Sequence, residues 1–293
     1  MSEENWTVLR MMEWSGGYLE GKGVERGRLD AEHLLADVLG LERLQLYLQF
    51  DRPLQPAELD RYRPLLKRRA QREPLQYILG RAAFRELELE VGEGVLIPRP
   101  ETEILLDEVF EWARGEESTE MAALDLGTGS GAIALSLLHE GPFTRVVATD
   151  VSDTALAMAK KNAEANGLAE AVEFRAGPYF DPVGEGEVFD LVVSNPPYVA
   201  EAEAATLQPE VRDWEPGEAL FSGPDGLDAL RTITAQARGY LRPGGMLALE
   251  VGSGQAGLVL DLLEDTEEYT DVRVRRDLTD RERLVLAHVA LTN

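Results

Sequence analysis

The chain has 293 residues, 44% of them hydrophobic, so it is long enough to bury the core of one large domain or of two. It has no cysteine, and His33, His139 and His288 lie too far apart for a local zinc motif, so we expect no metal site. The formal charge of −25 disfavours binding to bare nucleic acid, because contact with phosphates needs clustered lysine and arginine.

The sequence also argues against contact with a membrane. No stretch approaches the roughly 18 apolar residues of a membrane span. The start, Met1-Ser2-Glu3-Glu4-Asn5, is acidic and lacks the apolar region of a signal peptide. We therefore predict a cytoplasmic enzyme whose partner is a protein or a small molecule.

The first 85 residues have the apolar spacing of helices. An apolar stripe over 34–41 predicts one helix, with Asp30 as its N-terminal cap and Gly40 at its end. A second helix is predicted from Pro56 to about residue 72, with Pro64 as the site of a kink. This helix carries the one basic cluster of the chain, which suits either solvated surface or the docking of an acidic or RNA-associated partner. The cluster consists of Arg61, Arg63, Lys67, Arg68, Arg69 and Arg72.

Residues 86–98 are predicted to form a β-hairpin that links two domains. The stretch 86–91 alternates polar and apolar residues, 92–94 contains two glycines that suit a turn, and 95–97 is apolar. Pro98-Arg99-Pro100-Glu101-Thr102-Glu103 then opens a helix whose apolar positions begin at Ile104.

From about residue 120 onward, predicted strands and helices alternate. This order favours an α/β, Rossmann-like fold with a mostly parallel sheet covered on both faces. No helix separates the last two strands, so the last one is expected to be inserted antiparallel. The predicted strands are 121–126, 145–150, 171–176, 188–194, 246–251, 271–277 and 284–290, and the predicted helices are 131–140, 153–167, 225–241 and 255–264.

A glycine-rich turn follows the first of these strands, with the sequence Asp125-Leu126-Gly127-Thr128-Gly129-Ser130-Gly131. It differs from the G-x-G-x-x-G pattern that places a pyrophosphate at a helix N-terminus. Evenly spaced glycines after an acid suit a ligand that has no pyrophosphate and carries a charged amino-acid end, which describes S-adenosylmethionine. Asp150 ends the next strand about 20 residues further on, where an acid accepts hydrogen bonds from ribose hydroxyls.

The stretch Ser194-Asn195-Pro196-Pro197-Tyr198 follows the fourth strand. The prolines hold Asn195 extended, although a plain strand end is the alternative for the Asn-Pro pair alone. If the side-chain oxygen of Asn195 and the carbonyl of Pro196 each accept one N–H of a planar NH₂ group, its nitrogen lone pair can face the methyl group of the cofactor. Tyr198 can stack on the flat group. We therefore predict Asn195, Pro196 and Tyr198 as the catalytic residues.

These motifs together resemble the bacterial release-factor glutamine N5-methyltransferases, the PrmC/HemK family. That family uses S-adenosylmethionine to methylate the glutamine of the Gly-Gly-Gln loop in peptide chain release factors. Asn-Pro-Pro-Tyr is also found in methyltransferases that act on exocyclic amines of adenine and guanine. Two stretches favour the release-factor enzymes over those that act on nucleic acid: Pro-Leu-Gln-Tyr-Ile-Leu-Gly at 74–80 and Ile-Pro-Arg-Pro-Glu-Thr-Glu at 97–103. Further stretches similar to the family lie at 30–35, 125–135 and 193–198.

The resemblance implies a class I methyltransferase domain over 99–293, a helical substrate-docking domain over 1–85, and the hairpin linker over 86–98. It implies release factors as protein partners without direct contact to nucleic acid, and we expect a monomer. The substrate glutamine would lie on Asn195, Pro196, Pro197 and Tyr198. The implied cofactor residues are Asp125, Gly127, Thr128, Gly129, Ser130, Gly131, Asp150, Tyr179 and Asn195.

Two positions depart from the family pattern. Where the family usually has an acid after the third strand, available to the adenine amino group, this chain has Pro178, so adenine must be recognised by other groups. The stretch 276–283 lacks the usual glycine of the family's terminal segment, and we assign it no catalytic role.

Two other functions remain as alternatives. A methyltransferase acting on an amine of adenine or guanine in nucleic acid would use the same corner, but the acidic charge and the lack of an evident basic recognition domain oppose it. A non-catalytic helical binding module would require a broken glycine loop or corner, and both are intact.

Overall fold

The computed structural model describes residues 6–118, 120–264, 268–277 and 279–291. They form two compact units, one made of Met1–Gly80 and Gln208–Trp214, the other of Arg81–Leu207 and Glu215–Asn293. The acidic start at Met1–Asn5 and Leu278 of the terminal segment, both used in the sequence predictions, lie outside the described residues.

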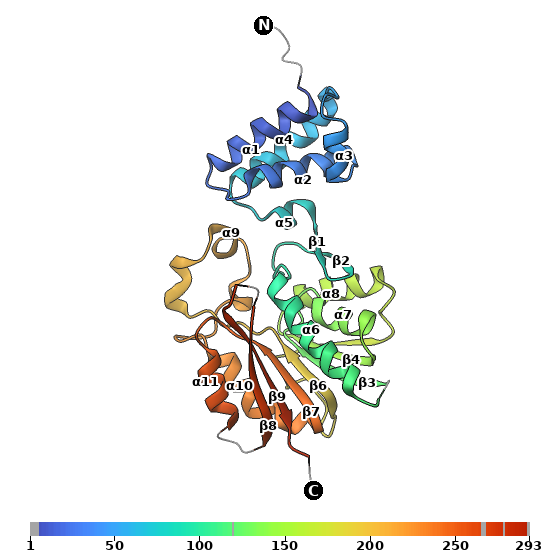
Figure 1. The fold of residues 1–293 in the computed structure, drawn as a ribbon, viewed down its shortest axis with the longest axis vertical. Coiled ribbons are helices and arrows are strands. Elements are labelled where there is room, and N and C mark those ends of the chain that lie inside the picture. The colour runs from blue at the N-terminus through green and yellow to red at the C-terminus, as the bar shows by residue number, and fades with distance from the viewer. Residues whose placement is uncertain (1–5, 119, 265–267, 278, 292–293) are drawn as a thin grey trace. The chain divides into compact units, whose positions relative to one another are not determined.

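The first unit is helical, and a short segment from late in the chain completes it (Figure 1). Its core is built from apolar residues of several helices, among them Met12, Leu34, Leu35 and Tyr62, all fully buried. The helices are α1 (Val8–Glu20), α2 (Gly27–Leu39), α3 (Arg43–Leu48), α4 (Pro56–Ala70), α5 (Leu75–Leu79) and the returning α9 (Pro209–Arg212).

The predicted N-terminal cap at Asp30 is wrong. Helix α2 starts four residues earlier than predicted, with Arg26 at its N-cap position, so Asp30 lies in the first turn. There its carboxylate is buried and accepts a hydrogen bond from Arg69 Nε at 2.7 Å. The acid therefore serves a tertiary ion pair that the local sequence does not reveal. Gly40 ends α2 with a left-handed φ of 63°, as predicted.

The basic cluster on α4 is not one exposed face. Arg69 is 6% exposed and lies between Asp30 and Glu210, whose Oε1 accepts from Arg69 Nη2 at 2.8 Å. Arg72 donates to Glu210 Oε2 at 2.6 Å, and these two arginines hold the pKa of Glu210 below its usual range although burial opposes the shift. The cluster members left exposed are Arg61, Arg63 and Lys67.

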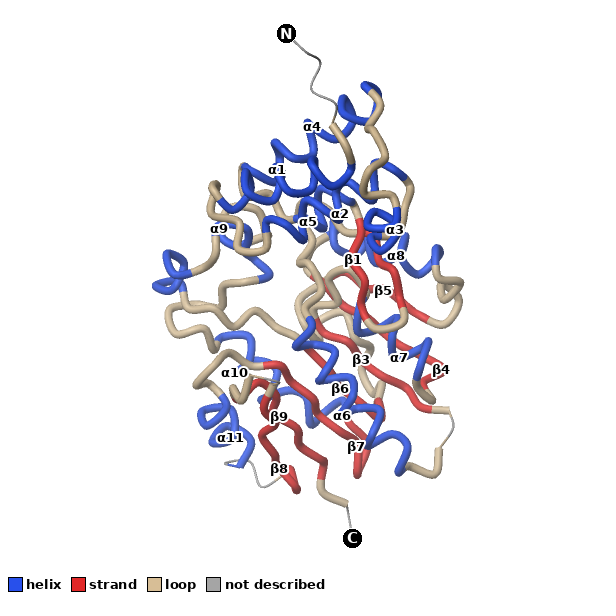
Figure 2. Tube along the Cα trace, turned by 45° about the horizontal axis from the view of Figure 1, so that its top comes forward, coloured by secondary structure: helices blue, strands red, loops and turns tan. Residues whose placement is uncertain are grey.

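The second unit is a three-layer α/β fold around a seven-stranded sheet, whose strands are red in Figure 2. The strand order is β5-β4-β3-β6-β7-β9-β8, with β9 antiparallel to both of its neighbours, which confirms the predicted insertion. The strands are β3 (Met121–Leu126), β4 (Phe143–Asp150), β5 (Val172–Ala176), β6 (Phe189–Ser194), β7 (Leu241–Glu250), β8 (Tyr269–Arg276) and β9 (Glu282–Val289).

Helices cover both faces of this sheet. Successive residues of a strand point to opposite sides, so Ala123 and Val193 face one apolar cluster while Leu124 and Val192 face the other. The first face packs against α6 (Pro100–Gly115) and α7 (Ala132–Glu140), and the second against α10 (Asp228–Gln236) and α11 (Ala256–Glu264). The remaining elements are α8 (Asp153–Ala165) and the 3-10 turns η1 (Glu201–Thr206), η2 (Gly217–Ala219) and η3 (Ala237–Tyr240).

The hairpin lies earlier in the chain than predicted. Strands β1 (Arg81–Phe84) and β2 (Leu87–Glu90) pair through a tight turn at Arg85, which takes a left-handed φ of 51°. Arg85 is fixed there by Glu140, whose carboxylate accepts from its Nε at 2.8 Å. The predicted strand over 95–97 is wrong, because that stretch leaves the hairpin and forms a wall of the pocket described below.

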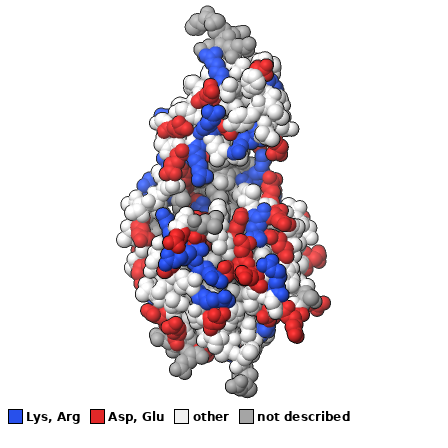
Figure 3. All heavy atoms as spheres, in the orientation of Figure 1, with Lys and Arg blue, Asp and Glu red and all other residues white. Residues whose placement is uncertain are grey.

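Among the described residues, no helix is both long and apolar enough to cross a membrane. On the face of the molecule drawn in Figure 3, acidic and basic side chains are interspersed. Many of the arginines are paired with acids, as in the pairs Arg175–Glu187 and Arg242–Asp190.

Candidate active site

The glycine loop joins β3 to α7 and forms one side of a pocket in the second unit. Gly127, Gly129 and Gly131 all have left-handed φ angles, 73°, 57° and 85°, which glycine adopts without the strain of a Cβ atom. A Cβ atom added at Gly127 or Gly129 would meet no heavy atom within 4 Å. The loop backbone therefore borders open space that a ligand can approach closely.

Asp125 lies beneath this loop and is fully buried. Its Oδ2 accepts from Thr128 Oγ1 at 2.7 Å and from the Ala134 amide at 3.2 Å, whereas Oδ1 is buried with no hydrogen-bond partner among the described residues. Burial raises the pKa of Asp125 to about 7. A cationic ligand nearby would stabilise the ionised form of this acid.

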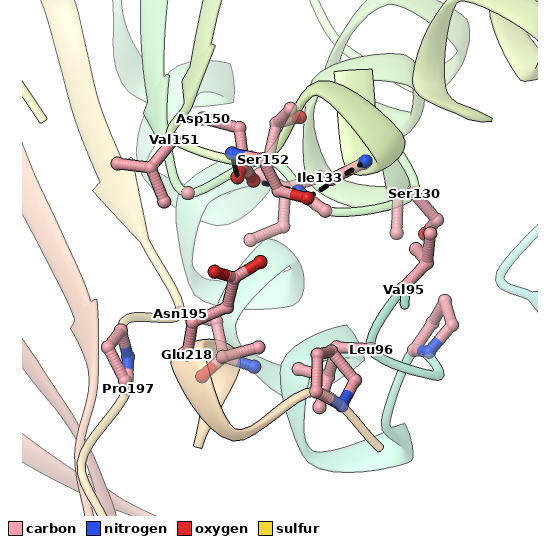
Figure 4. Close-up of a pocket in the computed structure, with 18 of the residues that line it drawn as sticks. Val95, Leu96, Ser130, Ile133, Asp150, Val151, Ser152, Asn195, Pro197 and Glu218 are labelled. Atoms are coloured by element: carbon pink, nitrogen blue, oxygen red, sulfur yellow. Dashed lines mark hydrogen bonds between the residues drawn. The ribbon is translucent and has the colours of Figure 1, made fainter. Parts of the chain in front are cut away.

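Asp150 stands at the end of β4 and closes the loop from the other side. Its Oδ2 accepts from the Gly129 amide and its Oδ1 from the Ser152 amide, each at 2.9 Å. Burial raises the pKa of this carboxyl group, although both backbone donors oppose the shift. Figure 4 shows Asp150 and Ser152 on the same side of the cavity. An acid in this place can accept a hydrogen bond from a ligand hydroxyl.

Two segments outside the sheet wall the pocket opposite the loop, and the second includes η2. One contributes Val95, Leu96 and Pro98, and the other contributes Pro216, Glu218 and Ala219. Arg99 and Glu215, the residues next to these walls, form a salt bridge. Figure 4 shows the carboxylate of Glu218 directed into the cavity.

The corner at Asn195 comes from β6, which lies between β3 and β7 in the sheet. Ser194 Oγ donates to the Leu126 carbonyl at 2.7 Å and so ties the end of β6 to the start of the glycine loop. Asn195 lines the pocket, and its Nδ2 donates to Thr102 Oγ1 at 3.0 Å. Thr102 Oγ1 in turn donates to Glu250 Oε2 at 2.7 Å.

Tyr198 is held by the same carboxylate. Its hydroxyl donates to Glu250 Oε1 at 3.1 Å, its carbonyl accepts from Gln255 Nε2 at 2.9 Å, and its ring packs against the second apolar cluster. Burial raises the pKa of the Tyr198 hydroxyl, with the negative charge of Glu250 adding to the effect. The hydroxyl is therefore neutral at physiological pH and is not a general base.

Tyr179 follows β5 and reaches the pocket in an unusual conformation. It has a left-handed φ of 44°, which is rare for a residue with a side chain, and its carbonyl accepts from Thr149 Oγ1 at 2.9 Å. Tyr179 lines the cavity while Phe180 is buried against Tyr240, with ring centroids 4.6 Å apart. This turn presents an aromatic side chain next to Pro178, the position at which the resemblance predicts an acid.

The structure brings most of the predicted site residues to one cavity. The lining includes Gly127, Thr128, Gly129, Ser130, Asp150, Tyr179, Asn195 and Pro197. Asp125 is buried under the loop and Gly131 is the N-cap of α7. The predicted catalytic residues Pro196 and Tyr198 are not among the residues that line the cavity. Sequence reasoning did not assign roles to Thr102, Glu215, Glu218 or Glu250. Thr102 lies in a motif that had been noted, but Glu250 had no signal beyond its place at a strand end.

Comparison with known proteins agrees with this geometry. Residues 11–80 match the family described as PrmC N-terminal domain, and residues 101–210 match the family described as Methyltransferase small domain. The release factor glutamine methyltransferase of Geobacter sulfurreducens is 45% identical over 96% of both chains. That of Chlorobaculum tepidum is 42% identical over 96% of this chain and 97% of its own. The chain belongs to the release factor glutamine methyltransferase family.

Membership confirms the predicted family, and with it the methyltransferase class and S-adenosylmethionine as the methyl donor. A solved methyltransferase from Pyrococcus furiosus has the same fold, with a TM-score of 0.50, 19% identity, and coverage of 70% of this chain and 90% of that chain. The predicted class I methyltransferase sheet is thereby confirmed.

Proposed function

We propose that this enzyme transfers a methyl group from S-adenosylmethionine to the side-chain amide nitrogen of the glutamine in the Gly-Gly-Gln loop of peptide chain release factors. One observation carries the proposal. Asn195 stands at the rim of the pocket built by the glycine loop, and Oδ1 of its amide has no donor among the described residues. That oxygen is available to a substrate N–H.

The residues present fit S-adenosylmethionine. Gly127 and Gly129 leave open space for a ligand close to the backbone, and the unpaired Oδ1 of Asp125 favours a positive charge nearby. We assign Asp150 to the ribose hydroxyls and Tyr179 to the adenine ring. An aromatic side chain can pack on adenine although Pro178 offers no acid to its amino group. The bound cofactor supplies a methyl group made electrophilic by the positively charged sulfur.

The protein's own contribution is to orient a weak nucleophile. The nitrogen of a carboxamide is planar, because its lone pair is delocalised into the carbonyl group. Acceptance of its two N–H groups by Asn195 Oδ1 and the Pro196 carbonyl would fix the direction of that lone pair. Holding reactants in such a geometry lowers a barrier by on the order of 7–11 kcal/mol at best. The proline corner keeps both acceptors in place before the substrate arrives.

Incubation with labelled S-adenosylmethionine and purified release factor tests the proposal. We expect one methyl group per release factor, located on the Gly-Gly-Gln glutamine by mass spectrometry of the loop peptide. A release factor in which that glutamine is replaced should take up no label. Transfer into DNA or RNA instead would contradict the assignment and favour the alternative, a nucleic-acid amine as substrate.

The helical unit is proposed to dock the release factor, since residues 11–80 match the PrmC N-terminal domain family and the pocket lining includes no residue of this unit. We further propose that the enzyme acts as a cytoplasmic monomer on a protein, without direct contact to nucleic acid. A single sedimenting species of 32.4 kDa would support the monomer.

A further inference from the structure

Three segments distant in the sequence converge behind Asn195. Thr102 lies in the first turn of α6, Asn195 follows β6, and Glu250 ends β7. Their hydrogen bonds form a chain that runs from the Asn195 amide through Thr102 to Glu250. The other oxygen of Glu250 receives the Tyr198 hydroxyl, so both carboxylate oxygens have a donor.

This chain is deeply buried, with Thr102 4% exposed and Glu250 1% exposed. Burial of a carboxylate is unfavourable unless hydrogen bonds compensate it, and well-packed apolar side chains commonly stabilise such a site as well or better. Stability of the fold alone therefore gives no reason for a carboxylate here. The hydrogen-bond link from Glu250 through Thr102 to Asn195, the acceptor that we assign to catalysis, provides a reason for this carboxylate.

The donors and acceptors along the chain have a defined direction. Burial raises the pKa of Glu250, and the hydrogen bonds from Thr102 and Tyr198 oppose the shift. A hydroxyl has one proton, and Thr102 donates that proton to Glu250 when the carboxyl group is ionised. Toward Asn195 the Thr102 oxygen can then only accept, so the group facing it must be the Asn195 NH₂. The carbonyl oxygen of the planar amide is consequently on the side away from Thr102.

We propose that Thr102 and Glu250 are positioning residues that fix the orientation of the Asn195 amide, so that Oδ1 rather than Nδ2 meets the substrate NH₂ group. The inference rests on the proposed function. If the Asn195 amide were flipped, its NH₂ group would face the NH₂ group of the substrate, and Oδ1 would no longer be available to accept from the substrate. Since Glu250 also holds Tyr198, one carboxylate fixes two residues of the corner.

Substitution of Thr102 tests the role of its hydroxyl. Thr102→Val keeps the shape and removes the hydrogen bonds, and we expect kcat to fall on the order of 10- to 100-fold, as for other supporting residues of active sites. The dissociation constant of S-adenosylhomocysteine should change less than threefold, as an order-of-magnitude bound on an effect limited to the corner. Thr102→Ser, which keeps the hydroxyl, should restore most of kcat.

Thr234→Val is a matched control. Thr234 is 3% exposed in α10 and donates to the Leu230 carbonyl at 2.8 Å, away from the pocket lining. Its substitution removes an equally buried hydroxyl but leaves no buried carboxylate short of a donor, so it should lower the melting temperature less than Thr102→Val does. Only Thr102→Val should lower kcat.

A double-mutant cycle tests whether Thr102 acts through Asn195. In the Asn195→Ala background, Thr102→Val should lower kcat by less than about twofold, because the group it positions is absent. Glu250→Gln is a second variant of the same chain and should lower kcat more in the wild type than in Asn195→Ala, where only its hydrogen bond from Tyr198 is left to lose. Equal losses in both backgrounds would overturn the positioning role.

The side-chain NH₂ signal of Asn195 in ¹⁵N NMR spectra gives a readout that does not depend on activity. Hydrogen exchange of this group should be slow in the wild type and in Thr102→Ser, and fast in Thr102→Val. The same rate in all three proteins would overturn the inference. If the wild type leaves release factor unmethylated while these rates differ as expected, the proposed function fails and the positioning chain does not.

Discussion

Two buried carboxylates flank the same pocket, and they are held in opposite ways. The donors to Asp125 come from its own loop and helix, three and nine residues further along the chain. The donors to Glu250 come from residues 148 and 52 positions away. Asp125 has one oxygen without a hydrogen-bond partner in the described part of the chain, whereas both oxygens of Glu250 accept hydrogen bonds. The comparison separates a buried acid with one unpaired oxygen among the described residues from a buried acid whose two oxygens both accept hydrogen bonds.

The largest expected effect concerns the pH dependence of stability that Asp125 causes. The pKa of Asp125 is about 7 in the folded protein and about 3.9 in an unfolded chain, so the folded state binds more protons between these pH values. The stability of the wild type should therefore fall, relative to Asp125→Asn, as pH rises from 4 to 7. At about 1.36 kcal/mol per pKa unit the difference is up to about 4 kcal/mol.

Urea unfolding of both proteins at pH 4.5 and pH 8 measures this difference. The comparison with Asp125→Asn cancels the titration of the other acids, which the two proteins share. An excess of S-adenosylmethionine should reduce the gap, if its positive charge lies near Asp125. A gap that does not depend on pH would show that Asp125 is no more protonated in the folded state than in the unfolded one.

Substitution of Asn195 tests the residue to which Glu250 is linked through Thr102. Asn195→Ala removes the acceptor for the substrate, and turnover should fall about 10²- to 10³-fold, the usual effect of losing one such group. The affinity for S-adenosylhomocysteine should change much less. Single-turnover kinetics and calorimetry separate the two quantities. Unchanged turnover would remove Asn195 from the mechanism and would leave Glu250 with only a structural role.

Gly129→Ala tests whether the cofactor lies close to the backbone of the glycine loop above Asp125. Gly129 and Gly167 both have left-handed φ angles, 57° and 71°, and a Cβ atom added at either meets no heavy atom within 4 Å. Each substitution should therefore cost about 1–2 kcal/mol of stability. Only Gly129→Ala should weaken cofactor binding, by about tenfold, because its methyl group would enter the pocket. Equal affinity for both variants would contradict close approach of the cofactor to the loop.

The smallest effect is expected outside the pocket, on the exposed cations Arg61, Arg63 and Lys67 of α4. Their joint replacement by serine should raise KM for intact release factor about three- to tenfold at low salt, as loss of surface charge complementarity does. KM for a short Gly-Gly-Gln peptide should not change.

The control for this variant replaces three exposed cations of the other unit, Arg114, Lys160 and Arg281, by serine. It changes the net charge equally and should leave both KM values unaltered. Identical behaviour of the two triple variants would deny the helical unit a docking role through these cations.

The same contrast explains what could be predicted from the sequence. The glycine loop, Asp150 and the corner at Asn195 are contiguous motifs at strand ends, and the strand pattern alone placed them at one edge of the sheet. Thr102 and Glu250 act through contacts between distant segments, which no local pattern encodes. Asp30 misled for the same reason, because its partner Arg69 is 39 positions away.

The return of 208–214 to the helical unit has a practical consequence for making fragments of this protein. A piece that ends at Gly80 retains Arg69 and Arg72 but lacks Glu210, the acid that accepts from both. A piece that starts at Arg81 carries Glu210 with neither arginine to meet it. No single cut of the chain separates the two units intact, so a shortened version of the helical unit needs residues 208–214 grafted back through a linker.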